Sequence, residues 1–304
     1  MHQPYSPSKE IRPSLQSRIV CRAVGALYDT SLRDFPRVVR IETTNACNAK
    51  CIICPHPVMT RPAKVMPPGL YNRIIDECGA NKCREVHLHN FGEPLLDKHL
   101  EDKVRYAKQK GIAKVKIFSN GSITTETRAI GLMEAGLDEM KISFDGSTKE
   151  EFERIRAPLK FDVVVENILT LVRLRNERKS SLRISINCVS TSDKSKTMEL
   201  LEKSVDSFSF GKIHNWGDGD FTEIDSRTRK PCSRVWRTFT VLVNGDVALC
   251  CLDYDGKKLL GRVDDKTTIK QIWSNPAYLE VRDLHRKAKM HHIDLCAKCS
   301  KSYV

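Results

Sequence analysis

Three cysteines with the spacing C-x-x-x-C-x-x-C, at Cys47, Cys51 and Cys54, are the residues of this chain that most directly suggest chemistry. They follow the apolar run at residues 38–41, so we expect them on a loop at the carboxyl end of a strand. Four thiolates normally hold a 4Fe-4S cluster, and three thiolates leave one iron free to bind a further ligand. A zinc knuckle or three unrelated buried thiols would give the same spacing.

A second group of cysteines lies near the carboxyl end of the chain. Its members could supply four thiolates to one site: Cys232, Cys250, Cys296 and Cys299. The second of these ends a short β run that Asn244-Gly245 would join to the preceding run as a hairpin. Four thiolates leave no position open, which is typical of structural zinc or of a closed 4Fe-4S cluster. The spacing alone fits either metal.

The segments between these two groups must position them, and their pattern is regular. Short apolar runs alternate with helix-period segments, which is typical of strand–helix units around parallel strands. We predict strands at 38–42, 85–89, 114–118, 139–144, 182–189 and 209–215. We predict helices at 69–78, 97–110, 124–135, 149–155, 161–177 and 192–206. Six such units indicate the α/β class, with a partial (β/α)6 TIM-like barrel and a small carboxyl-terminal domain of a β-hairpin and helices.

Polar side chains follow several of the predicted strands. Reactive groups in β/α barrels lie on loops at the carboxyl ends of strands, so these side chains are candidates for a common site. The candidates are Gly92, Glu93 and Pro94 after the second strand, Ser119 and Asn120 after the third, Ser143 at the end of the fourth and Asn187 in the fifth. Each of these residue types also forms ordinary turns, so no single loop is decisive.

The cysteine loop, the glycine-glutamate-proline turn one strand later and the second cysteine group together resemble the radical S-adenosylmethionine (SAM) superfamily. The second group resembles the SPASM/twitch domain that many of these enzymes carry at the carboxyl end. The resemblance implies an amino-terminal arm at 1–36, a radical SAM partial barrel at 37–220 and a SPASM/twitch domain at 221–304. It also implies a SAM-cleaving 4Fe-4S cluster on the first three cysteines and one auxiliary 4Fe-4S cluster on the other four.

The resemblance assigns the polar candidates to SAM. The Gly92-Glu93-Pro94 turn would contact the amino group of SAM, and the polar residues after later strands would hold its carboxylate and ribose. Two residues depart from the family pattern. Ile53 stands where the family usually has an aromatic residue near the adenine, and Phe91 replaces the first glycine of the usual G-G-E-P turn. Neither change removes a cluster ligand.

The function implied is that of a radical SAM oxidoreductase. An external one-electron reductant such as flavodoxin or ferredoxin would start the cleavage of SAM to a 5′-deoxyadenosyl radical, which removes a hydrogen atom from the substrate. The auxiliary cluster could accept the second electron, and by resemblance we expect dehydrogenation of a sugar or aminocyclitol. Three alternatives stay open: an epimerase with Cys251 as hydrogen donor, radical modification of a peptide or RNA, and a non-catalytic iron–sulfur electron carrier.

The composition bounds the partners and the compartment. The chain has 304 residues, twelve cysteines and a formal net charge of +13, and it shows no export signal or membrane-spanning run. We therefore expect a cytoplasmic protein whose cysteines serve metal or redox chemistry rather than disulfides. The basic residues are interleaved with acids, which favours a solvated surface over a nucleic-acid site.

Overall fold

The computed structural model describes residues 13–202, 204–216, 228–297 and 299–300. The first twelve residues of the predicted arm lie outside these ranges, and so does the boundary that we placed between 220 and 221. Within the described residues, no helix combines the length and the apolar character needed to cross a bilayer.

One open sheet of nine strands organises the molecule, in the order β6-β5-β4-β3-β2-β1-β7-β8-β9. The six barrel strands run parallel: β1 (Val38–Ile41), β2 (Glu85–His87), β3 (Lys114–Ser119), β4 (Glu139–Ser143), β5 (Arg183–Cys188) and β6 (Ser207–Phe210). The remaining strands are β7 (Thr238–Val241), β8 (Asp246–Ala248) and β9 (Leu259–Arg262). The sheet does not close on itself, which confirms the predicted partial barrel.

The hairpin of the carboxyl-terminal domain belongs to the same sheet as the barrel. β7 pairs in parallel with β1 along its whole length, while β8 and β9 follow in antiparallel pairing. β1 is therefore the barrel strand that borders the carboxyl-terminal domain. The loop that follows β1 carries Cys47, whereas Cys232 precedes β7 and Cys250 follows the antiparallel β8, so the two cysteine groups flank the same pair of adjacent strands.

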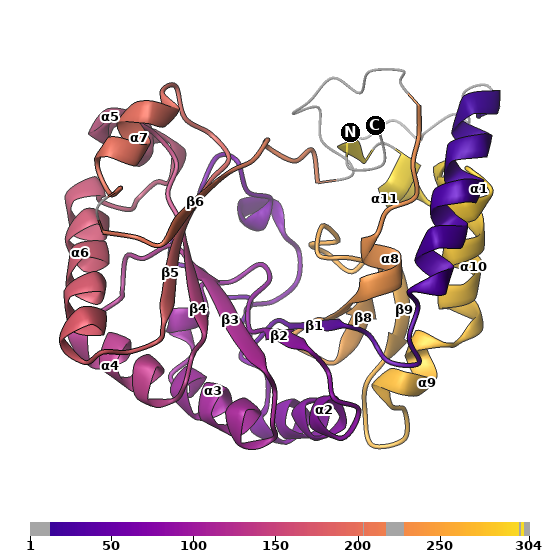
Figure 1. Ribbon diagram of the computed structural model, residues 1–304, viewed down its shortest axis with the longest axis horizontal. Helices are drawn as coiled ribbons and strands as arrows, with labels where there is room; N and C mark the ends of the chain where they lie inside the picture. The colour runs from indigo at the N-terminus through magenta and orange to yellow at the C-terminus, as the bar shows by residue number, and fades with distance from the viewer. Residues whose placement is uncertain (1–12, 203, 217–227, 298, 301–304) are drawn as a thin grey trace.

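Helices cover the outer side of the sheet (Figure 1). Around the barrel they are α2 (Pro68–Ala80), α3 (Leu100–Gln109), α4 (Glu126–Glu134), α5 (Lys149–Ile155), α6 (Phe161–Glu177) and α7 (Lys194–Glu199). The second domain adds α8 (Arg234–Arg237), α9 (Ile269–Trp273), α10 (Pro276–Arg286) and α11 (Asp294–Ala297). Short 3-10 turns lie at His56–Val58, Pro94–Leu96 and Met290–His292.

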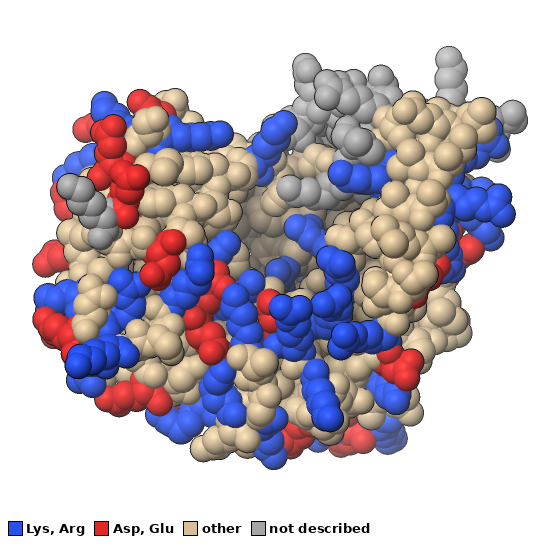
Figure 2. Space-filling model, viewed as in Figure 1, with Lys and Arg blue, Asp and Glu red and all other residues tan. Residues whose placement is uncertain are grey.

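Strand alternation separates an apolar outer face from a polar inner face. In β3, Val115 and Ile117 are fully buried toward the helices, while Lys116 and Phe118 are half-buried on the opposite side. The register places Arg40, His87 and Lys116 side by side across β1, β2 and β3. Figure 2 shows the molecule hollowed on this inner side, with Lys and Arg side chains gathered next to the hollow. The partial barrel therefore offers a polar inner surface.

The structure adds one helix that we did not predict. α1 (Leu15–Thr30) lies in the segment treated as an arm and packs against α10. Gly25 permits the close approach, because a Cβ atom there would lie 2.7 Å from Cγ of Arg286. Asp29 accepts hydrogen bonds from Arg286 and from the indole of Trp236. These contacts join the segment to the second domain, and the hydrogen bond from the indole of Trp273 to the carbonyl of Arg33 adds to them.

Five of the six predicted strands end later than the observed ones, by one residue at the first, fourth and fifth. The second ends at His87 instead of residue 89, and the sixth spans Ser207–Phe210 instead of 209–215. His214 and Trp216 therefore lie beyond the ladder, on the chain that leaves β6.

Candidate functional site

The first cysteine group lies on a loop whose backbone amides hydrogen-bond to the chain at the end of α5. The amide of Lys50 donates to the carbonyl of Ala157 at 2.6 Å, and that of Ile52 donates to the carbonyl of Ile155 at 3.0 Å. The amide of Cys54 donates to the carbonyl of Cys51 at 3.1 Å, which closes a turn between two of the cysteines. The loop is therefore docked on the end of α5.

The three thiols share one water-poor environment. Cys51 is buried and the other two are half-buried. Burial raises the pKa of Cys47 to about 12 and that of Cys54 to about 11, and burial also raises the pKa of Cys51. Thiolates, not thiols, bind metals, so positive charge must be bound before these groups lose their protons. The loop suits an electrophilic metal group better than it suits free thiolates.

The geometry argues against a single metal ion. Sulfurs bound at about 2.3 Å to one zinc lie within about 4 Å of each other. In the part of the chain that the structure describes, no three His, Cys, Asp or Glu side chains converge in that way. An iron–sulfur cube holds its thiolates at its corners, farther apart than one ion does. Among the described residues, the cysteine loop is therefore not arranged around one metal ion.

The turn after β2 is built against the start of the cysteine loop. A Cβ atom on Gly92 would lie 2.2 Å from the carbonyl oxygen of Thr44, so only glycine fits there. The next amide, that of Glu93, donates to the carbonyl of Ala46 at 2.8 Å. Pro94 then begins a short 3-10 turn. These contacts fix the turn next to the cysteines.

The Glu93 carboxylate is buried and already holds several donors. It accepts hydrogen bonds from the amides of Leu95 at 3.1 Å and Asn120 at 2.6 Å, and from the Ser119 hydroxyl at 2.8 Å. Burial raises its pKa. Ser119 also accepts a hydrogen bond from the amide of Gly121. Ser119 is buried and supports the Glu93 carboxylate, so its predicted role at the SAM site would act through the turn at 92–94.

The other polar candidates are placed in two ways: Asn120 bonds to the cysteine loop, and Ser143 and Asn187 lie on the inner face of the sheet. The Asn120 amide donates to Asn48 of the cysteine loop at 2.8 Å and so ties the loop after β3 to the loop after β1. Ser143 and Asn187 are directly paired across β4 and β5 and are half-buried on the inner side. Both can therefore meet a ligand in the hollow.

Sequence analysis missed Arg156, which follows α5. It is 7% exposed and forms an ion pair with the fully buried Asp145, which also accepts from the amides of Val189 and Ser190. Its Nη1 lies 3.9 Å from Sγ of Cys51, and its Nε has no hydrogen-bond partner. No local sequence pattern marks this position, because it depends on the docking of the cysteine loop.

The second cysteine group surrounds a cavity. The cavity is lined by four thiols and five other residues: Cys232, Arg234, Val235, Leu249, Cys250, Leu252, Leu295, Cys296 and Cys299. Burial raises the pKa of Cys250 and of Cys296, as expected of thiols far from water. The pKa of Arg234 is raised first by the charge of Cys251 and then by the charges of the cavity thiols Cys232, Cys250 and Cys299. The cavity therefore combines four sulfur ligands with one compensating cation.

Comparison with known proteins decides the family. Residues 41–201 match the Radical SAM superfamily, and residues 232–300 match the SPASM iron-sulfur cluster-binding domain. The chain belongs to the radical SAM superfamily. Its cofactors are SAM, a 4Fe-4S cluster and an auxiliary 4Fe-4S cluster in the SPASM domain.

Two curated relatives illustrate the range of similarity. The S-adenosyl-L-methionine-dependent 2-deoxy-scyllo-inosamine dehydrogenase of Niallia circulans is 23% identical over 266 residues, which cover 86% of this chain and 92% of the relative. The probable GTP 3′,8-cyclase of Methanopyrus kandleri is 29% identical over 171 residues, which cover 56% of this chain and 52% of the relative. The chain thus spans nearly all of the first relative and about half of the second.

Solved structures of radical SAM proteins share the fold. BtrN in complex with AdoMet and 2-DOIA superimposes with a TM-score of 0.63 at 21% identity, over 86% of this chain and 92% of BtrN. Streptococcus suis SuiB bound to its precursor peptide SuiA gives a TM-score of 0.68 at 13% identity, over 92% of this chain and 75% of SuiB. At these identities the similarity is one of fold.

The two residues that depart from the radical SAM pattern, Ile53 and Phe91, both contact Trp216. The indole of Trp216 donates to the carbonyl of Ile53 at 3.1 Å, so an aromatic side chain from the end of β6 lies against this position. The Phe91 ring packs against Trp216 at 5.7 Å and against Tyr254 at 6.1 Å between ring centroids. Tyr254 belongs to the SPASM domain, so Phe91 links the turn after β2 to that domain.

Cys251 lies apart from the cavity of the second cysteine group. β8 ends at Ala248, so Cys250 and Cys251 lie in the bend that follows the strand. Their side chains therefore point in different directions because of this bend and not because of strand alternation. Burial acts to raise the pKa of Cys251, but the guanidinium groups of Arg40 and Arg234 outweigh it and lower the pKa. Since Arg40 is half-buried on the inner face of β1, Cys251 lies at the border between the SPASM domain and the hollow.

Proposed function

We propose that this radical SAM protein oxidises a sugar- or aminocyclitol-type metabolite. The observation that carries the proposal is the second cysteine cavity, built on a hairpin whose β7 pairs directly with β1. Four thiolates without an open position suit a group that accepts an electron and does not bind substrate. The similarity along nearly the whole chain to a SAM-dependent 2-deoxy-scyllo-inosamine dehydrogenase supports the same class of reaction.

The residues divide into two ligand sets. Cys47, Cys51 and Cys54 would hold the first cluster, which when bound supplies the electron that cleaves SAM to a 5′-deoxyadenosyl radical. Cys232, Cys250, Cys296 and Cys299 would hold the auxiliary cluster. An acidic one-electron carrier such as flavodoxin or ferredoxin is the proposed external reductant.

The surrounding side chains would orient SAM. Arg156 offers a buried positive charge beside Cys51, with an Nε that has no partner, and so is suited to hold the SAM carboxylate. The turn at 92–94 would face the amino group, with Glu93 fixing the turn. Asn120, Ser143 and Asn187 remain the candidates for the ribose and the substrate.

Electron counting favours oxidation. The substrate would lose one hydrogen atom to the 5′-deoxyadenosyl radical, then one electron to the auxiliary site and one proton to the protein or solvent. A C–H and an O–H bond of an alcohol would thereby become a carbonyl group. The half-buried hydroxyl and amide groups on the inner sheet face can hydrogen-bond a hydroxyl-rich substrate.

A direct experiment tests this proposal. The protein is reconstituted anaerobically with iron and sulfide, reduced with dithionite, and incubated with SAM and a panel of aminocyclitols and sugars. The proposal expects 5′-deoxyadenosine and an oxidised product in equal amounts for one of these compounds. Zinc in place of iron, or no SAM cleavage under dithionite, would contradict it.

One observation supports a second candidate, radical epimerisation. Cys251 lies outside the cavity and next to Arg40 at the edge of the hollow, where a thiol could return a hydrogen atom to a substrate radical. For an oxidation, we expect Cys251→Ala to keep product formation within about twofold of the unchanged protein, because no bond of the reaction involves this thiol. Loss of product with continued 5′-deoxyadenosine formation would instead establish the epimerase. Cys188→Ala, a buried thiol of β5, is the matched control.

A further inference from the structure

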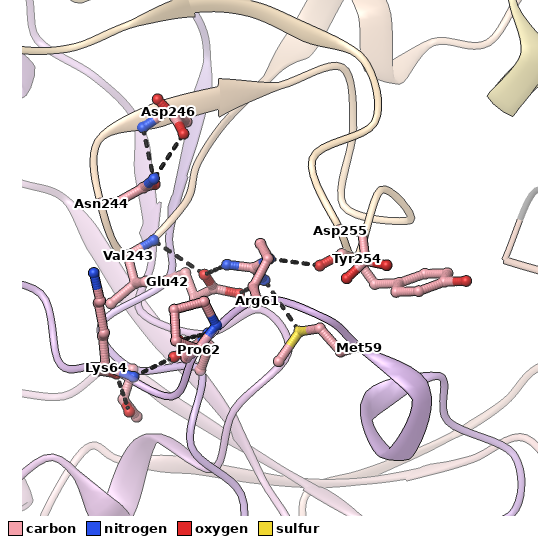
Figure 3. Close-up of polar contacts among 12 residues, drawn as sticks. Glu42, Met59, Arg61, Pro62, Lys64, Val243, Asn244, Asp246, Tyr254 and Asp255 are labelled. Atoms are coloured by element: carbon pink, nitrogen blue, oxygen red, sulfur yellow. Dashed lines mark hydrogen bonds and ion pairs between the residues drawn. The ribbon is translucent and has the colours of Figure 1, made fainter.

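A buried ion pair joins the barrel to the SPASM domain. Glu42 directly follows β1 and is completely buried. Its carboxylate accepts two hydrogen bonds from the guanidinium of Arg61, at 2.6 and 2.8 Å, and a third from the amide of Val243 at 3.0 Å. Figure 3 shows Arg61 lying between Glu42 and the SPASM-domain residue Tyr254. One carboxylate therefore holds both parts of the molecule.

Arg61 makes a further contact to the SPASM domain. Its Nε donates to the carbonyl oxygen of Tyr254 at 2.6 Å. The neighbouring amide of Thr60 donates to the Asp255 carboxylate at 2.8 Å. These two bonds reach the loop at 250–258, which begins with Cys250 and is held in shape by Asp253, the acceptor for the amides of Lys257 and Lys258.

The segment that carries Arg61 is also part of the first cysteine loop. The amide of Lys64 donates to Oδ1 of Asn45 at 2.6 Å, and the Nδ2 group of Asn45 donates to the carbonyl of Pro62 at 3.0 Å. These bonds join the residues just before Cys47 to those just after Arg61. The three SAM-cluster cysteines thus lie inside a loop whose two ends are fastened beside the ion pair.

The chemistry of this pair suggests a role beyond stability. A buried Arg–carboxylate pair contributes little net stability compared with apolar side chains, since desolvation opposes the Coulomb attraction. Its planar, two-point geometry instead permits few alternative arrangements of the groups it joins. The pair therefore specifies how the loop at 45–64 sits on the loop at 250–258.

We propose that Glu42 and Arg61 form an interdomain clasp that couples the two cluster sites. The clasp makes the loop at 45–64 and the loop at 250–258 a single cooperative unit. Occupancy of the auxiliary site orders the chain after Cys250. Because the clasp bonds this chain to Arg61, the loop around the SAM site becomes more ordered as well. The inference rests on the proposed ligand sets. Arg61 acts in it as a positioning residue, since its side chain bonds to Glu42, to Met59 and to the carbonyl of Tyr254.

A double-mutant cycle on SAM affinity tests the clasp. Four reconstituted proteins are compared by anaerobic calorimetric titration with SAM: the unchanged protein, Cys296→Ser/Cys299→Ser, Arg61→Met, and the combination of all three changes. In the unchanged background we expect loss of the auxiliary ligands to raise the Kd for SAM by about tenfold, within the usual range of coupling between sites. In the Arg61→Met background we expect less than a twofold effect.

Arg73→Met is the matched control. Arg73 and Asp265 form another ion pair between the barrel and the SPASM domain, at 3.1 Å, but both side chains are substantially exposed. We expect the tenfold coupling to persist in Arg73→Met. Hydrogen exchange gives an independent readout: Arg61→Met should increase exchange at 59–64 and at 252–258 together.

Several outcomes would overturn the clasp. An equal fold-loss of SAM affinity in both backgrounds, or increased exchange confined to 59–64, excludes coupling through Arg61. If Arg61→Met does not fold, Arg61→Lys keeps the charge without the two-point geometry and must show reduced coupling. Failure of the proposed function looks different, because the unchanged protein would then bind SAM and show the coupling but would oxidise none of the aminocyclitols and sugars.

Discussion

Cys51→Ala is expected to abolish 5′-deoxyadenosine formation and to lower bound iron from about eight to about four atoms per chain, because two thiolates do not retain a cube that needs three. Cys51 is the central thiol of its loop and is buried, so solvent water does not readily take its place. Iron and sulfide analysis after anaerobic reconstitution, together with chromatography of the nucleoside products, measures both effects.

Cys296→Ala/Cys299→Ala is the matched control, since it should remove the same amount of iron from the other site. At saturating SAM we expect this variant to form 5′-deoxyadenosine while the oxidised product falls by at least tenfold, because the second electron has no acceptor. Equal loss of SAM cleavage in both variants would contradict the division into a SAM-cleaving site and an electron-accepting site.

Arg156→Met is expected to weaken SAM binding by about 10- to 100-fold. A hydrogen bond between two charged groups contributes about 1.5–3 kcal/mol, and Met removes it while keeping much of the side-chain volume. The same change leaves the fully buried Asp145 without its cation. Removing one partner of a buried ion pair costs about 3–5 kcal/mol of stability, so the thermal midpoint should fall as well.

A second variant separates these two effects. Asp145→Asn/Arg156→Met removes the stranded charge, so we expect most of the lost thermal stability to return while SAM affinity stays low. Arg154→Met, an exposed residue of α5, is the control for loss of a nearby charge and should change neither quantity. Recovery of SAM affinity in the double variant would show that Arg156 only neutralises Asp145.

The continuous sheet explains how two cysteine groups that are distant in sequence can cooperate. β1 ends at the cysteine loop and pairs with β7 on one side and with β2, which precedes the Gly92 turn, on the other. The carboxyl ends of the parallel strands β1 and β2 bring the cysteine loop and the Gly92 turn together, and the hairpin turn after β7 lies beside them. Cys232 precedes β7 and Cys250 follows the antiparallel β8, so the second cysteine group lies toward the other end of β7. The Glu42–Arg61 pair lies at this same junction.

The partial barrel was predictable because each strand is a short apolar run and each helix has a 3.6-residue period. Lys149–Ile155 and Phe161–Glu177 have the predicted bounds, and three further barrel helices overlap their predicted ranges closely. The helix predicted at 192–206 was too long, since α7 spans only Lys194–Glu199. α1 was not predictable, since its docking depends on a glycine that lets Arg286 approach. Hydrophobic periodicity reports which face of an element is buried, and it carries no information about the partner.

The two cysteine groups together with the Gly92-Glu93-Pro94 turn determined, by their resemblance to the radical SAM superfamily, the family, the cofactors and the two ligand sets that we propose. They suffice because metal ligands close together in sequence must also be close in space. Only the tertiary structure revealed Arg156 beside Cys51, the support of Glu93 by Ser119, and the clasp between Glu42 and Arg61. Each of these contacts joins residues from different loops, and no short sequence pattern encodes which loops will meet. The sheet order decided that by bringing β7 to β1.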